Sequence, residues 1–349
     1  MYGREVGDRS FYMDDRPLPL ACVFSVEGET LTMAERSLFS AAQPFGFILF
    51  GRNCKSPEHI RKLTDQLRNA VGWHCPIMID QEGGRVARLR GPNWPEFSAA
   101  RVYGDAIDQG AGDAKLRHDM TALAKMLKAE GINANCAPVV DVLFPETHQV
   151  IGDRAYSSDP RCVAQAAAIT AEAFLNAGVQ PIIKHLPGHG RATADSHLDL
   201  PVVSASIEEL GSTDFYPFHA LATSPMSAKL WGMVAHIIYD KIDPDLPSTL
   251  SKIVINKVIR EKIGFQGLLF TDDLDMKALE KYGSIPERAN LSLQAGCDVA
   301  LYCWAKLDVM ERLAAELPPL SAKGWARWEA SLNSCENTHC NKNACIHDH

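Results

Sequence analysis

The sequence has no long apolar run and no block of basic residues. Nowhere do about eighteen uncharged apolar residues follow one another, so no membrane-spanning helix is predicted. The first sixteen residues alternate charges and lack the apolar core of a secretory signal. A net charge of −8 at pH 7 disfavours nucleic-acid binding, which needs a basic face. We therefore expect a cytoplasmic protein whose partners include neither a membrane nor a nucleic acid.

The spacing of the ten cysteines fits neither a disulfide framework nor a standard zinc finger. Seven of them are scattered, several inside apolar runs, which is typical of buried reduced thiols. The other three lie with three histidines in a polar segment over 335–349. We predict that this segment is a disordered or loosely docked tail, and a zinc site is the alternative.

Short β-branched apolar runs recur along the chain, and each is followed by a longer stretch with helical spacing. This alternation is typical of βα units. It predicts eight strands, over 20–26, 46–50, 76–79, 132–140, 179–183, 233–238, 268–271 and 298–302. The predicted helices include 57–71, 113–130, 160–177, 207–221, 252–262, 286–295 and a closing stretch over 324–332.

Eight alternating units can form an open doubly wound sheet or a closed (β/α)8 barrel. The open fold usually has a glycine-rich phosphate loop after its first strand, and residues 25–28 offer only one glycine. The sequence therefore favours a single (β/α)8 TIM-type barrel with some irregular strands over 18–334, between a leader over 1–17 and the tail. The long connection between Gly91 and Gly112 is interpreted as an excursion at the rim.

Chemically capable side chains follow the third to the seventh predicted strand. In such a barrel the carboxyl ends of the strands converge on one mouth. Each group alone has an ordinary interpretation as a helix cap, a solvated surface group or a core histidine. Five consecutive strand ends with such groups favour one shared site instead. The groups are, in order, Asp80, Asp141, Lys184 with His185, His236 and Asp272.

The segment 184–197 carries three histidines and one aspartate after a predicted strand. Asp195 precedes His197 by two residues, so its carboxylate can orient the imidazole and raise its basicity for general acid/base work. The competing interpretation is a zinc site formed by His185, His189 and His197. The Pro-Gly turn between the first two histidines excludes the helical spacing that many such sites use.

The segment 267–276 ends an apolar strand in three carboxylates. A carboxylate that projects into the mouth can attack an anomeric carbon and leave again. We predict this role for Asp272, and we expect Asp273 and Asp275 to cap or face the following helix. The alternative is that all three are acids of a helix N-terminus, which the helix dipole favours.

The segment 80–88 combines Asp80 with Arg85 and Arg88 around a Gly-Gly turn. Glycine lets the backbone approach a ligand closely, and a carboxylate with a guanidinium can bracket sugar hydroxyls. A structural salt bridge is the alternative interpretation.

Three motifs stand in the same order as in a known family. They are Asp-Gln-Glu-Gly-Gly-Arg at 80–85, Lys-His-Leu-Pro-Gly-His-Gly at 184–190 leading to Asp-Ser-His at 195–197, and Thr-Asp-Asp-Leu at 271–274. Together they resemble the family 3 glycoside hydrolases, specifically the single-domain bacterial β-N-acetylglucosaminidases of peptidoglycan recycling. Leu186 departs from the family pattern, which usually has Phe.

The resemblance implies roles for individual residues. Asp272 would be the nucleophile, and His197 the acid/base that Asp195 orients. The non-reducing-end sugar would be held by Asp80, Arg88, Arg154, Lys184 and His185. Arg154 is assigned because Ile-Gly-Asp-Arg at 151–154 matches a further family element.

The resemblance also implies a reaction. The expected activity is retaining removal of terminal N-acetylglucosamine from N-acetylglucosaminyl-anhydro-N-acetylmuramic acid, with or without its peptide, through a covalent glycosyl-enzyme. No cofactor or metal is expected, and the partner would be this small carbohydrate. We expect a bacterial cytoplasmic enzyme that is a monomer or a weak dimer.

Three other functions remain open from the sequence. A pair of Asp and His also suits phosphate as the second nucleophile, so a glycoside phosphorylase is one alternative. A metal-dependent barrel hydrolase is the second. A sugar-binding protein without catalysis is the third, although both predicted catalytic positions are filled.

Overall fold

In a computed structural model, residues 17–192 and 200–333 are described. Eight parallel strands close into a barrel in the order β1-β10-β9-β7-β5-β4-β3-β2, which confirms the predicted fold. The strands are β1 Leu20–Ser25, β2 Pro44–Leu49, β3 Ile77–Ile79, β4 Ala134–Asn135, β5 Gln180–Leu186, β7 Trp231–Val234, β9 Leu269–Asp273 and β10 Val299–Leu301. Two short strands, β6 (Val202–Val203) and β8 (Ile238–Tyr239), pair outside it.

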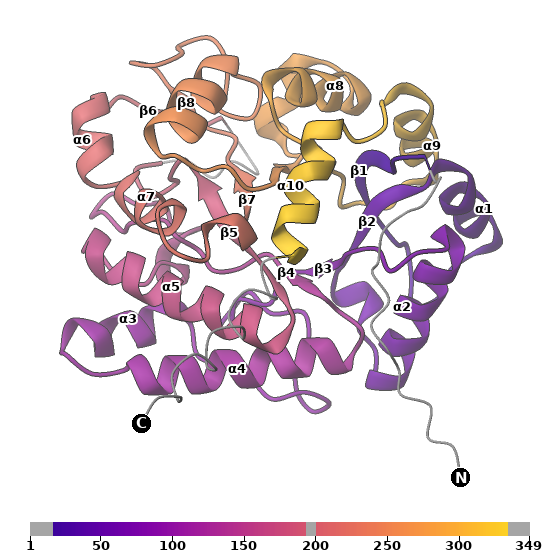
Figure 1. Cartoon of the computed structure of the whole chain (residues 1–349), viewed down its shortest axis with the longest axis horizontal. Helices are drawn as coiled ribbons and strands as arrows, with labels where there is room; N and C mark the ends of the chain where they lie inside the picture. The colour runs from indigo at the N-terminus through magenta and orange to yellow at the C-terminus, as the bar shows by residue number, and fades with distance from the viewer. Residues whose placement is uncertain (1–16, 193–199, 334–349) are drawn as a thin grey trace, which may run out of the picture.

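Helices surround the barrel on its outer side (Figure 1). None of the described helices combines the length and the apolar character that crossing a membrane requires. The longer ones are α1 Met33–Ala42, α2 Pro57–Val71, α3 Ala100–Asp108, α4 Asp113–Ala129, α5 Pro160–Ala177, α6 Ile207–Ser212, α7 Tyr216–Ala222, η4 Val254–Lys262, α8 Ile285–Ala295, α9 Leu307–Glu316 and α10 Ala322–Asn333. Short turns of helix occur at η1 Gly51–Asn53, η2 Gly152–Arg154, η3 Ser227–Lys229 and η5 Lys277–Tyr282.

The ends of α2 show how local sequence sets the helix boundaries. The Ser56 side chain accepts a hydrogen bond from the backbone N–H of His59, and Pro57 takes the first helical position, where no N–H is needed. The helix stops at Gly72, whose φ of 73° ends the last turn in the left-handed region that glycine adopts without strain.

The prediction of one helix over 207–221 is wrong. The chain forms α6 and α7 with a break between Ser212 and Tyr216. Pro217 explains the break, because a proline in the interior of a helix lacks a donor and clashes with the preceding turn. In the structure Pro217 lies in the first turn of α7, where proline is tolerated.

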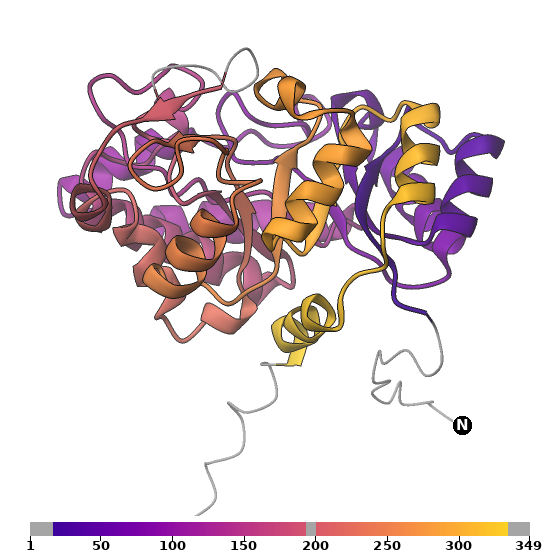
Figure 2. The ribbon, with the colours of Figure 1, turned by 90° about the horizontal axis from the view of Figure 1, so that it is seen from above.

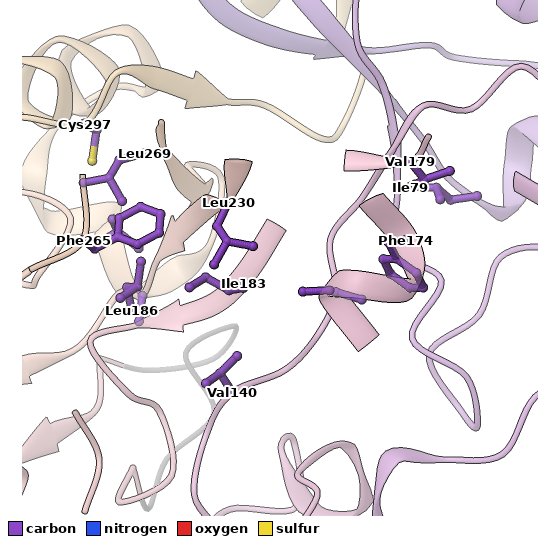
Figure 3. Close-up of a cluster of buried hydrophobic side chains, with 14 of the residues drawn as sticks. Ile79, Val140, Phe174, Val179, Ile183, Leu186, Leu230, Phe265, Leu269 and Cys297 are labelled. Carbon is purple, nitrogen blue, oxygen red and sulfur yellow. The ribbon is translucent and has the colours of Figure 1, made fainter. Parts of the chain in front are cut away.

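Two apolar layers hold the barrel together. Outside the strands, Phe265, Leu269 and Leu186 belong to the layer between strands and helices and gather in one cluster (Figure 3). Inside the barrel, Phe45 and Phe270 lie 5.9 Å apart between ring centroids. The two layers fix the direction of every strand and hence of the residues at the strand ends.

Helix α10 covers the end of the barrel at which the strands begin (Figure 2). Its Trp328 contacts Phe45 edge-on at 6.4 Å between ring centroids. Arg327 forms an ion pair with Asp298 at 2.6 Å, and the Trp231 indole donates to Ser331 at 3.0 Å. These contacts close the amino-terminal end and leave the opposite end as the mouth.

Candidate active site

A cavity of about 350 Å³ lies at the carboxyl ends of the barrel strands. Six of the predicted site residues line it, namely Asp80, Arg88, Arg154, Lys184, His185 and Asp272. They come from three strand ends and from the loop after β4, so the fold brings together residues up to 192 positions apart in the chain. The predicted acid/base pair, Asp195 and His197, lies outside the described residues, as do the predicted leader up to residue 16 and the Cys/His tail.

Five ionised side chains on the β3–β5 side form what we call the charged cluster: Asp80, Glu82, Arg88, Arg154 and Lys184. The Lys184 Nζ lies 2.9 Å from Asp80 Oδ1 and 2.7 Å from Glu82 Oε1. Arg88 Nη2 lies 3.1 Å from Asp80 Oδ2. Arg154 donates two hydrogen bonds of 2.8 Å to the two oxygens of Glu82. Every carboxylate of the cluster therefore has two cationic partners.

This pairing controls the ionisation of the cluster. Burial alone would raise the pKa of Glu82, but Arg154 and Lys184 outweigh it and lower the pKa to about 2. Lys184 and Arg88 likewise hold the pKa of Asp80 below its usual value against burial. Burial opposes the charge of Lys184, yet Asp80 and Glu82 raise its pKa. The cluster, which is partly buried, thus stays ionised at neutral pH with one more cation than anions.

His185 is oriented by a carboxylate beneath it. Its Nδ1 lies 2.7 Å from Asp141 Oδ2, so Nδ1 carries the proton and Nε2 lies toward Arg154, 3.5 Å from Nη2. The other oxygen of Asp141 accepts hydrogen bonds from the backbone N–H groups of His185 and His189, at 3.2 and 2.7 Å. Asp141 is completely buried and does not line the cavity, so its contacts are those of a positioning group.

His189 also lines the cavity, with its ring edge-on to His185 at 5.6 Å between centroids. Burial and the neighbouring His185 lower the pKa of His189 to about 4, which leaves the ring neutral at pH 7. Within the described ranges no three or more His, Cys, Asp or Glu side chains are grouped as metal ligands. The zinc interpretation with His197 falls partly outside those ranges.

On the opposite side of the mouth, β9 ends in two cavity-lining carboxylates. Asp272 Oδ1 accepts a hydrogen bond from the backbone N–H of Asp273 at 2.8 Å. Asp273 does not cap the next helix, so the prediction is wrong for this residue; its Oδ1 accepts instead from the backbone N–H of Asp275 at 3.2 Å, in the turn before that helix. Its Oδ1 also accepts from the backbone N–H of Cys303 at 3.3 Å, and its Oδ2 from the indole of Trp304 at 3.0 Å. The strand extends to Asp273, which turns its side chain toward the chain after β10.

The two adjacent acids differ from the charged cluster in their electrostatics. Burial, together with the charge of Asp272, raises the pKa of Asp273 to about 6, although backbone N–H donors partly oppose the shift. Within 17–192 and 200–333, the hydrogen-bond donors to Asp273 are all neutral. Asp273 therefore differs from Asp80 and Glu82, whose pKa values are lowered.

His236 holds the backbone at the end of β9 through a hydrogen bond to the carbonyl of Asp273. Its Nδ1 lies 2.7 Å from Thr249 Oγ1, and its Nε2 lies 2.9 Å from the backbone oxygen of Asp273. The carbonyl can only accept, so Nε2 carries a proton. His236 does not line the cavity, although it follows the sixth barrel strand as predicted. It holds the backbone that carries the two acids.

Several cavity-lining residues were not singled out from the sequence, among them Glu82, Arg52 and Trp304. Glu82 lies in the motif at 80–85, between Asp80 and Arg85. Trp304 follows the eighth strand, so the strand-end rule applied once more would have found it. Arg52 follows β2 and donates to Ser25 Oγ at 2.6 Å, which links two strand ends.

Comparison with known proteins defines the class. The model of the glycosyl hydrolase family 3 N-terminal domain matches residues 24–323. The chain belongs to glycosyl hydrolase family 3 and is a glycoside hydrolase. Within that class it is similar to curated β-hexosaminidases, such as that of Alkalilimnicola ehrlichii, which is 39% identical over 283 residues, 80% of each chain.

Solved structures show the same similarity to β-N-acetylglucosaminidases. NagZ from Neisseria gonorrhoeae, in complex with N-trifluoroacetyl-D-glucosamine, matches with a TM-score of 0.82 and 29% identity over 90% of each chain. A family 3 β-N-acetylglucosaminidase from Paenibacillus matches with a TM-score of 0.78 and 29% identity over 89% of this chain and 59% of that one. The similarity to bacterial β-N-acetylhexosaminidases thus extends over nearly all of the barrel.

Proposed function

We propose that this protein is a retaining exo-β-N-acetylglucosaminidase with Asp272 as its nucleophile. The observation that carries the proposal is the position of the Asp272 carboxylate in the cavity wall, across the mouth from the charged cluster. A carboxylate there can reach the anomeric carbon of a sugar whose hydroxyls are bound by the cluster. The similar Neisseria protein was solved with N-trifluoroacetyl-D-glucosamine, a 2-acylamino sugar, which supports an N-acetylglucosaminide as the substrate.

The charged cluster suits the non-reducing-end sugar. Hydroxyl groups both donate and accept, so neighbouring carboxylates and cations can bind one sugar through several charge-assisted hydrogen bonds. We assign this role to Asp80, Arg88, Arg154, Lys184 and His185. Since the ion pairs of the cluster are already formed, little side-chain entropy is lost on binding. A sugar chain would enter with its terminal residue first.

The proposed reaction has two steps. Asp272 attacks the anomeric carbon and forms a glycosyl ester, while His197 donates a proton to the departing oxygen. Water then gives a proton to His197, attacks the same carbon and releases the sugar and the Asp272 carboxylate. The net configuration is retained. The roles of His197 and of Asp195, which would orient it, rest on the family resemblance.

The proposed substrate is N-acetylglucosamine linked to anhydro-N-acetylmuramic acid, with or without its peptide, in bacterial cell-wall recycling. This finer assignment rests on the resemblance to NagZ-like enzymes. The cytoplasm is the proposed compartment. Seven cysteines, all of those in the described part of the chain, are free thiols, which agrees with a reducing environment.

The test is hydrolysis of an aryl N-acetyl-β-glucosaminide by the wild type and by Asp272→Asn. We expect the variant to lose more than about a thousandfold in kcat, because an amide is a poor nucleophile, while inhibitor binding persists. NMR should show β-N-acetylglucosamine as the first wild-type product. Near-normal turnover by Asp272→Asn, or an α product, would contradict the proposal.

Two additions to the same assay separate the other functions. Formation of a sugar phosphate in phosphate buffer would identify a phosphorylase instead of a hydrolase. Loss of activity with a strong chelator, restored by metal, would identify a metal-dependent hydrolase. We expect the free sugar as product in both cases, with an unchanged rate. Replacement of His197 should slow natural substrates more than activated aryl ones.

A further inference from the structure

The lining of the cavity changes from buried to exposed toward the mouth. The Lys184 side chain, at the deep end, is only 3% exposed. At the mouth the exposed lining residues are Arg52, Arg85 and Trp304. Both arginines donate to protein acceptors, Arg52 to Ser25 Oγ and Arg85 to Asp153 Oδ1. Trp304 is the apolar residue of these three and is 58% exposed, so it offers an apolar surface to a ligand at the rim.

Trp304 is held in place from its edge. Its indole N–H donates to Asp273 Oδ2 at 3.0 Å, and the other Asp273 oxygen accepts from the backbone N–H of Cys303. An exposed tryptophan would otherwise sample several rotamers. This edge-on bond ties the ring to the residue next to Asp272 and leaves the ring faces available to a ligand.

The backbone beside Trp304 is strained. Ala305 has a φ of 56°, in the left-handed region that residues with a Cβ rarely adopt, and it is buried. Such a conformation is unfavourable and persists only where the surrounding structure enforces it. The chain after β10 thus bends sharply at the residue that follows the exposed ring.

We propose that Trp304 is a binding platform for the leaving group of the glycoside, and that it stacks on the apolar C–H face of a sugar ring there. The ring faces of tryptophan attract the weakly positive C–H bonds of a pyranose. This inference rests on the proposed function, in which the non-reducing-end sugar takes the deep charged cluster. The remainder of the substrate must then leave through the open mouth, past the exposed ring.

The experiment compares wild type, Trp304→Ala and Trp304→Phe. The probes are N-acetylglucosamine as an inhibitor, methyl N-acetyl-β-glucosaminide, which has no ring in its leaving group, and the disaccharide N,N′-diacetylchitobiose, which has one. For Trp304→Ala we expect kcat/KM for the disaccharide to fall about fivefold, in keeping with the loss of about 1 kcal/mol of ring stacking. The methyl glycoside and the inhibition constant of N-acetylglucosamine should change by less than about twofold.

Trp304→Phe keeps a stacking face but loses the N–H bond to Asp273, so it should restore only part of the disaccharide rate. Val102→Ala, at an exposed apolar position on α3, is the matched control and should change nothing. An equal loss on all three probes would place Trp304 against the deep sugar and overturn the inference, and so would no loss on the disaccharide. If the wild type hydrolysed none of the glycosides, the proposed function would fail. The dissociation constants of the disaccharide and of N-acetylglucosamine, measured by calorimetry for wild type and Trp304→Ala, would then still test the role of Trp304.

Discussion

The two sides of the mouth treat their carboxylates in opposite ways. In the charged cluster, Asp80 and Glu82 each contact two cations, and their pKa values are held below normal. On the β9 side, Asp272 and Asp273 lie next to each other in the chain, and burial with the charge of Asp272 raises the pKa of Asp273 to about 6. The same residue type is thus made inert on one side and basic on the other.

This difference indicates a division of work. Carboxylates with fully formed ion pairs are poor nucleophiles and poor bases, but they are rigid acceptors for hydroxyl groups. A carboxylate whose pKa is raised binds a proton more tightly and is the stronger base. The charged cluster is therefore suited to binding and the β9 side to reaction. Substitutions that change only charge or geometry can test this division.

The largest stability effect should come from Glu82→Gln. The change leaves Arg154 and Lys184 with a neutral partner in a buried site, so the free energy of unfolding at pH 7 should fall by about 3 kcal/mol. Glu82 has a folded pKa of about 2, below its usual 4.5, so its contribution is complete above pH 4.5 and is lost as the pH falls toward 2. Urea unfolding at pH 7, 5, 4 and 3 should show that the difference in free energy of unfolding between wild type and variant becomes smaller as the pH falls.

Glu261→Gln is the matched control for that measurement. Glu261 pairs with Lys257 on the surface of η4, where its side chain is 59% exposed. Exposed pairs contribute less than about 1 kcal/mol. A loss at Glu261 as large as at Glu82, or a gap for Glu82→Gln that does not depend on pH, would contradict the electrostatic account of the cluster.

An intermediate effect is expected from Arg88→Lys. The guanidinium lies 3.1 Å from Asp80 and over the ring of Phe50 at 5.4 Å, and an ammonium cannot keep both contacts. We expect kcat/KM for the aryl glycoside to fall about tenfold, with the inhibition constant of N-acetylglucosamine raised to the same extent. Arg101→Lys on α3 serves as the control. A change in kcat alone would argue that Arg88 does not bind the deep sugar.

The smaller stability effect should come from Asp273→Asn, with a pH dependence opposite to that of Glu82. Its folded pKa of about 6 lies above the usual 3.8, so the folded state binds the proton more tightly. Its favourable contribution is present below pH 3.8 and is lost as the pH rises through 6. Relative to Asp273→Asn, the wild type should lose about 2 kcal/mol between pH 4 and pH 7 in urea unfolding. Parallel curves for the two proteins would refute this.

The places of all eight strands could be predicted from the sequence, because buried parallel strands are short apolar runs between turn residues. The fourth was predicted too long, since only Ala134–Asn135 of 132–140 forms a strand. The strand-end rule then located Asp80, Lys184, His185 and Asp272 in one cavity. Closure of the barrel was decided by the missing glycine-rich loop. These inferences depend only on local pattern and on the common geometry of the fold.

Other features needed the three-dimensional structure. Arg154 lies in η2, in the loop after β4, and pairs with Glu82 from 72 positions away, which no spacing rule predicts. It was expected at the site only through the family resemblance. The turn of Asp273 toward Trp304 depends on how the chain bends after β10, at Ala305. Long-range pairing of loops is decided by packing and not by local propensity.

Because α10 covers the amino-terminal end of the barrel, a polymeric substrate can reach the cavity only from the mouth. Trp328 packs against Phe45 and Arg327 pairs with Asp298, so this end of the barrel is closed. The cavity is therefore a pocket with one opening and not a tunnel. A glycan strand cannot be threaded through it. Each released monosaccharide would have to exit the way it came in before the next chain end could be accepted, so the enzyme would work distributively, one bond for each encounter.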